Sequence, residues 1–71
     1  MITKEQLLDA GLHSNDGVEW YDGNGPQIMY NIKEQALYEH CEVAGVGEKL
    51  CIVKDIDKLV DLYYSMFNEE L

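Results

Sequence analysis

Residues 50–68 read LCIVKDIDKLVDLYYSMFN and join a short apolar run to an amphipathic helical pattern. Asp55 stands where a helix N-cap is expected, because its carboxylate can accept a hydrogen bond from a first-turn N–H. Asp57 adds negative charge at the positive end of the helix dipole. An apolar stripe at helical spacing follows, formed by Ile56, Leu59, Val60, Tyr63 and Phe67. We therefore predict a helix over residues 55–68.

This predicted helix needs a surface to pack on, because a helix of its length is not stable alone in water. Leu62 and Met66 widen its apolar stripe on one side. The only large apolar surface available is the set of strand-like segments that precede it. The run from Leu50 to Val53 is apolar at every position, which predicts a central strand or one covered on both faces.

The first residues carry the signature of a second, shorter helix. Thr3 with Gln6 three residues later fits a capping box, in which each side chain satisfies a backbone N–H of the other. Gly11 follows the last periodic residues and can adopt the left-handed conformation that closes a helix. We predict a short helix over residues 4–10.

Turn-forming residues divide the middle of the chain into strand-like segments. Loops are expected at His13–Gly17, Asp22–Pro26, Asn31–Gln35 and Ala44–Glu48. The predicted strands are Val18–Tyr21, Gln27–Ile32, Ala36–Val43 and Lys49–Lys54. Residues 32–40 could also form a helix, since they contain good helix formers, but their polar–apolar alternation favours a strand. The expected fold is a single α+β domain over residues 1–71, with a short N-terminal helix, a four-stranded antiparallel meander and a C-terminal amphipathic helix packed on the sheet.

The charge of the chain limits its partners. It has 14 acidic residues, 5 lysines and no arginine, which gives a formal net charge of -9. Nucleic acids and anionic membranes are bound through clustered Lys and Arg, so direct binding to either is not expected. A basic protein partner would be attracted at long range, although the same charge could serve only to keep a small protein soluble. No apolar run approaches a membrane span and no secretory leader is recognisable, so we expect a cytoplasmic protein.

The two cysteines allow a redox hypothesis. If residues 43–49 form a loop symmetric about Val46, Cys41 and Cys51 lie directly opposite each other on adjacent strands. Directly opposed Cβ atoms are about 4.5–5.5 Å apart, close to the ~3.8 Å of a disulfide. The pair could then form a disulfide and make the chain a redox-responsive domain. The alternative is that both are small buried apolar residues in a reducing compartment.

No motif for catalysis or for a cofactor is present. His40 and Cys41 are neighbours on a predicted strand and point to opposite faces, and the cysteine spacing matches no zinc motif. Asp22 and Asn24 have side-chain oxygens of the kind that bind calcium, but Pro26 interrupts the sequence pattern of a calcium-binding loop. Gly45 and Gly47 lack the Lys and Ser or Thr of a phosphate-binding loop. We therefore expect a non-enzymatic protein without metal or cofactor.

With no catalytic or cofactor motif, the surface residues are the remaining candidates for a function. One Trp, five Tyr and one Phe are more aromatic residues than so small a core readily hides, and Trp and Tyr are enriched at binding hot spots. The candidate partner-binding residues are Trp20, Tyr21, Tyr64, Asp57, Asp61, Glu69 and Glu70. Alternatively, single exposed aromatics carry no function. A further alternative is a self-associating structural protein, a homodimer formed through Leu62, Tyr64 and Met66.

The layout of the chain resembles a group of small proteins. Its opening MITKEQLL, its tyrosine-rich middle and its closing VKDIDKLVDL resemble the small acidic accessory proteins of bacteriophages and mobile elements. That resemblance covers the whole chain as layout and carries no catalytic or binding motif. It implies an accessory protein that binds a host protein, and in some acidic members an inhibitor that covers a nucleic-acid-binding surface.

Overall fold

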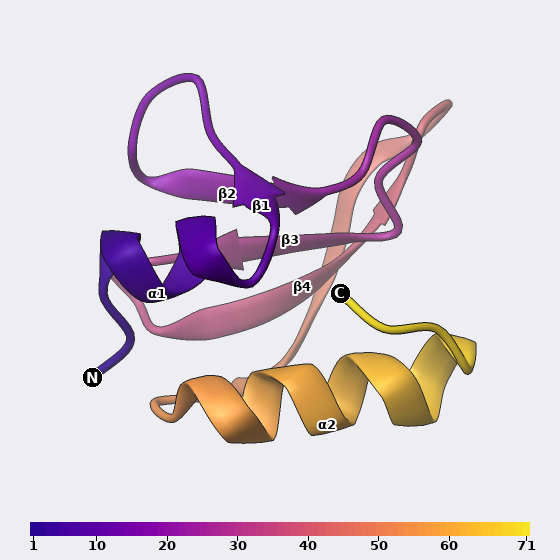
Figure 1. Cartoon of the computed structure of the whole chain (residues 1–71). Helices are drawn as coiled ribbons and strands as arrows, with labels where there is room; N and C mark the ends of the chain where they lie inside the picture. Colours follow the sequence, from indigo (N-terminus) through magenta and orange to yellow (C-terminus); the bar gives the residue numbers. More distant parts are fainter.

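A computed structural model describes all 71 residues as one α+β unit (Figure 1). Its elements in chain order are α1 (Lys4–Asp9), β1 (Leu12–His13), β2 (Glu19–Asp22), β3 (Ile28–Asn31), β4 (Ala36–Cys41), β5 (Gly45–Ile52) and α2 (Ile56–Phe67). All neighbouring strands are antiparallel and follow one another in sequence order, so the predicted meander is confirmed. Neither helix is of a length and composition that could cross a membrane.

Both helices begin at the caps that the sequence predicts. The Thr3 hydroxyl accepts a hydrogen bond from the backbone of Gln6, and the Gln6 side chain accepts one from the backbone of Thr3. Asp55 accepts hydrogen bonds from the N–H groups of Asp57 and Lys58. These contacts satisfy N–H groups that have no partner within the helix, which fixes the first residue of each helix.

The register of the sheet sorts its side chains onto two faces. Directly opposed residues point to the same face of neighbouring strands. One row, which faces the core, consists of Trp20, Tyr30, Leu37 and Cys51. The row on the other face consists of Tyr21, Met29, Tyr38 and Lys49. The core therefore lies on the first of these faces.

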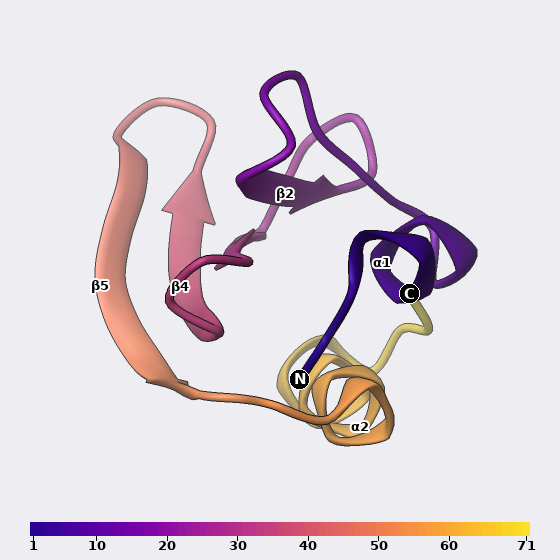
Figure 2. The same cartoon turned by 90° about the vertical axis from the view of Figure 1, so that its left-hand side faces the viewer.

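The sheet curls, and both helices lie on its concave side (Figure 2). Leu59 and Tyr63 of α2 are buried in the same apolar cluster as Trp20 and Tyr30. Leu7 of α1 belongs to that cluster as well. The predicted packing of the C-terminal helix on the sheet is therefore confirmed.

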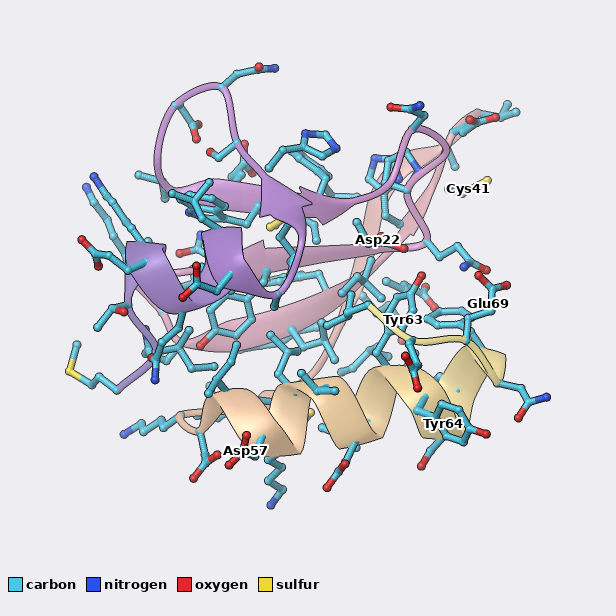
Figure 3. All side chains as sticks on the ribbon, in the orientation of Figure 1. Asp22, Cys41, Asp57, Tyr63, Tyr64 and Glu69 are labelled. Atoms are coloured by element: carbon cyan, nitrogen blue, oxygen red, sulfur yellow. The ribbon has the colours of Figure 1, made fainter.

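A buried hydrogen-bond network holds α2 against the turn between β2 and β3. The Tyr63 hydroxyl donates to Asp22 Oδ2 over 2.5 Å and accepts from Gln27 Nε2 over 3.2 Å (Figure 3). Asp22 Oδ1 accepts from the N–H groups of Gln27 and Ile28, each over 2.9 Å. Asp22 is only 6% exposed, so these bonds replace the water that its carboxylate loses on folding.

The sheet has five strands, not the four that we predicted. The additional strand, β1, lies within residues that we expected to be a loop or its edge. Gly11 has a φ of 93°, a left-handed conformation that turns the chain after α1 and directs Leu12 along the sheet. Leu12 and His13 then pair with Asp22 and Tyr21. Two residues are too few for an alternating pattern, so this strand could not be predicted from the sequence.

The last strand also differs from our prediction. β5 begins at Gly45, inside the expected loop, and Gly45 pairs there with Cys41 of β4. Gly47 lies against the Glu39 side chain, where a Cβ would come 2.5 Å from Glu39 Cγ. β5 is an edge strand rather than a central one. Leu50 and Ile52 are 42% and 50% exposed, so the apolar run is not covered on both faces.

The segment with two possible structures is a turn followed by a strand, as we preferred. The Asn31 side chain accepts hydrogen bonds from the N–H groups of Lys33 and Glu34, which closes the turn before β4. Gln35 then adopts a left-handed φ of 55°. The helical alternative for residues 32–40 is therefore wrong.

The predicted pairing of the two cysteines is wrong. Cys41 lies opposite Gly45, and Cys51 lies opposite Leu37. The loop is not symmetric about Val46, and β4 and β5 shift register near Tyr38. A β-bulge, an extra residue on one strand, produces such shifts and cannot be read from the spacing of the cysteines. Both thiols are free.

Candidate functional site

The largest hollow of the molecule lies where the end of α1, the middle of α2 and the last residues of the chain meet. It has a volume of about 420 Å³. We call it the acidic groove, and its lining residues are Asp9, Ala10, Val60, Asp61, Tyr64, Glu70 and Leu71. This volume is at the small end of the range of ligand pockets, which is roughly 300–1,000 Å³.

A left-handed residue after α2 brings the last residues of the chain towards α1. Asn68 ends α2 with a φ of 55°, so the chain turns back after the helix. Figure 2 shows the last residues running from α2 towards α1. The backbone of Leu71 lies 3.9 Å from the position that a Cβ would take at Gly11. The last residue of the chain therefore lies beside the residue that follows the end of α1.

The lining of the groove combines apolar and acidic side chains. Ala10 and Leu71 are partly buried and pack against the core, so they form an apolar floor. Tyr64 is 51% exposed and lies one helical turn from Asp61 on the same side of α2. Asp9, Asp61 and Glu70 are exposed at the rim. The lining contains no Lys, Arg or His, so its negative charge has no cation within the groove itself.

The structure gathers only part of the predicted partner-binding set into this groove. Asp61, Tyr64 and Glu70 line it, and Asp9 joins them from α1. Asp57 is exposed near the start of α2, outside the groove (Figure 3). Glu69 is not among the residues that line the groove. Burial and the hydrogen bond to Asp22 raise the pKa of Tyr63, and the charge of Glu69 adds a smaller effect in the same direction. Sequence reasoning missed Asp9, because nothing local to residue 9 indicates that residues 61 and 70 are its neighbours.

Trp20 does not lie on the surface, so it cannot contact a partner in this structure. It is 4% exposed and belongs to the apolar core. Its indole N–H donates a hydrogen bond to the Gly17 carbonyl over 3.1 Å, which satisfies the only polar atom of the side chain. Trp20 therefore supports the fold, and we remove it from the candidate partner-binding residues.

Tyr21 lies on the opposite face of the sheet, beside two histidines. Its ring is 5.3 Å from the ring of His40 and 6.3 Å from that of His13, measured between centroids. The two imidazoles also hydrogen-bond the carbonyls of Pro26 and Gly23, over 2.9 and 2.7 Å. These hydrogen bonds hold the turn between β2 and β3 in place, so the two histidines have a structural role away from the acidic groove. Tyr21 and the two histidines come from three strands, so the sequence alone did not bring them together.

A smaller hollow of about 220 Å³ lies beside the turn between β4 and β5, and Cys41 and His40 are among its lining residues. The thiol of Cys41 is exposed, and hydrogen bonds from the N–H groups of Ala44 and Val43 lower its pKa. No group of three or more His, Cys, Asp or Glu side chains is arranged to hold a metal ion.

Comparison with known proteins finds no match among family models, curated proteins or solved structures.

Proposed function

We propose that this chain is a non-enzymatic protein-binding module that acts in the cytoplasm by occupying a basic surface of a partner protein. The arrangement that carries the proposal is the acidic groove, where Asp61, Tyr64 and Glu70 surround a hollow without a cation. An exposed aromatic ring beside carboxylates is a composition that suits the binding of a basic partner. The net charge of -9 would add long-range attraction to the encounter.

The partner surface is proposed to be one that otherwise binds nucleic acid. Such surfaces carry clustered Lys and Arg, which match the sign of this chain's charge. By covering them, the protein would act as an inhibitor or accessory factor of the kind that its layout resembles.

The test has two steps. The tagged chain is first used to purify partners from its source cells at about 50 and 500 mM salt, which changes the Debye length several-fold. We expect a basic protein that is retained only at the lower salt. The purified partner is then loaded with a fluorescent oligonucleotide, and addition of the chain should displace it. Recovery of no basic protein at low salt, or a complex that is insensitive to salt, would contradict the proposal.

A second candidate function is self-association, because the edge strand β5 exposes apolar side chains. Val46, Leu50 and Ile52 are each more than two-fifths exposed along this edge. Exposed edge strands can pair with a second copy, although bulges such as those between β4 and β5 oppose this pairing. Sedimentation at micromolar concentration decides between the two functions, since a monomer of 8.1 kDa excludes a stable homodimer.

A further inference from the structure

We propose that the acidic groove receives a single arginine side chain from the partner. This inference rests on the proposed function, since it names the chemical group that the acidic surface recognises. The occupant is an exposed arginine on a basic protein segment, with its aliphatic part on the apolar floor and its guanidinium group at the acidic rim.

The charge of the groove selects a cation. Asp9 comes from α1, Asp61 from α2 and Glu70 from the segment after α2, so carboxylates surround the hollow from three parts of the fold. Neither helix has a basic residue in its last turn to offset the negative end of its dipole. Asp9 is the last residue of α1, where a carboxylate is unfavourable for the helix. A bound cation would relieve this unfavourable arrangement.

The aromatic and apolar lining favours arginine over lysine. The half-exposed ring of Tyr64 offers a face on which a planar guanidinium group can stack. Ala10, Val60 and Leu71 provide a floor for the aliphatic part of the side chain. The guanidinium group carries five N–H donors spread over a plane, so it can reach carboxylates that lie on different elements, whereas an ammonium group is a compact point charge.

The test is an NMR titration of the full chain, labelled with nitrogen-15, at low salt. N-acetyl-arginine amide is the probe, and N-acetyl-lysine amide is the matched comparison. We expect saturable shifts at the amides of Ala10, Asp61 and Tyr64, with a Kd on the order of 1–10 mM for arginine. Lysine should bind about threefold more weakly, because it lacks the stacking interaction.

Two pairs of variants separate the groove from diffuse charge. Asp61→Asn should weaken arginine binding by about three- to fivefold. Asp57→Asn makes the same charge change on the same helix, outside the groove, and should have little effect. Tyr64→Leu should abolish the preference for arginine over lysine, and Tyr64→Phe should keep it. Shifts spread over all acidic residues, or equal effects of the two Asp variants, would overturn the proposal.

The outcomes also distinguish this inference from the proposed function. If a basic partner binds in a salt-sensitive manner but Asp61→Asn binds it as tightly as the unmodified chain, the arginine site is wrong and the protein-binding function stands. If the arginine probe binds in the groove but the source cells yield no basic partner, the arginine site stands and the proposed function is wrong. Asp61 and Tyr64 are exposed, so substitution at either position should leave the fold intact.

Discussion

Gln35 joins three parts of the chain, namely its first residues, the turn before β4 and the segment after β5. Its side chain accepts a hydrogen bond from the Ile2 N–H over 2.7 Å and donates to the carbonyls of Ile2 and Ile32. Its backbone carbonyl accepts from the Val53 N–H over 2.8 Å. It is 3% exposed, so these bonds have no replacement from water. A single amide group therefore joins the start of the chain to the turn before β4.

Shortening this side chain should destabilise the fold. Asn tolerates the left-handed φ of Gln35 but is one methylene shorter and cannot reach Ile2. We expect Gln35→Asn to lower the free energy of unfolding by about 2 kcal/mol, because buried backbone groups lose their partners. Urea denaturation measures it, and Lys33→Asn in the same turn is the exposed control. Equal stability of the two variants would contradict the role of Gln35.

The raised pKa of Tyr63 makes the free energy of unfolding depend on pH in alkaline solution. Burial and its hydrogen bond to Asp22 raise the pKa of Tyr63 to about 12, from 10.0. Between these two pKa values the unfolded chain loses the phenol proton and the folded chain keeps it, so unfolding becomes more favourable as pH rises. This contribution of Tyr63 to stability is complete below pH 10 and declines between pH 10 and about 12.

The variant Tyr63→Phe tests this pH dependence. It should be less stable than the unmodified chain at neutral pH, since Asp22 loses a buried donor, by about 1–3 kcal/mol. It should also lose stability less steeply above pH 10. Urea denaturation from pH 8 to pH 11 measures both effects. Tyr64→Phe, in the exposed neighbouring position, is the control, and an unchanged slope in Tyr63→Phe would argue against the assignment.

Among the elements, the hairpin of β4 and β5 departs most from its prediction. Two register shifts separate its base, where Cys51 lies opposite Leu37, from its tip, where Cys41 lies opposite Gly45. The thiols therefore occupy different parts of the hairpin. The shifts also bend the edge strand, which is a common protection against pairing with other chains.

The two thiols should differ in reactivity. Cys41 is exposed and its pKa is lowered by backbone hydrogen bonds, whereas Cys51 is partly buried beside the core. Since the thiolate is the reactive form, iodoacetamide at neutral pH should alkylate Cys41 faster than Cys51. Peptide mass spectrometry over time gives both rates. Under a mild oxidant, loss of two hydrogens from the monomer through a Cys41–Cys51 disulfide would contradict the register of the hairpin.

At the scale of the whole molecule, neither the sheet nor α2 can be stable without the other. The sheet places Trp20, Tyr30 and Leu37 on its concave face, and α2 covers them with Leu59 and Tyr63. A domain of this size has only a few kcal/mol of stability, roughly 3–5. Loss of one central contact should therefore remove much of it.

Leu59→Ala tests this dependence. Leu59 is completely buried, so its truncation should lower the free energy of unfolding by about 2–5 kcal/mol, enough to leave much of the protein unfolded. Leu8→Ala is the matched control, because Leu8 is 59% exposed on α1 and should change stability by less than about 0.5 kcal/mol. Circular dichroism with thermal denaturation compares the two. A folded, unchanged Leu59→Ala protein would show that α2 is dispensable to the core.

The sequence by itself determined the two helices, the turns before β3 and β4 and the sign of the surface charge. Helix caps such as Thr3 and Asp55 act on N–H groups within three residues, so they can be recognised locally. The tertiary structure alone decided the two-residue strand β1, the edge position of β5, the separation of Cys41 from Cys51 and the acidic groove. The groove is lined by residues 9–10, 60–64 and 70–71, which meet because the sheet curls around α2 and the chain turns back at Asn68 towards α1. No local pattern records the proximity of segments so far apart in sequence.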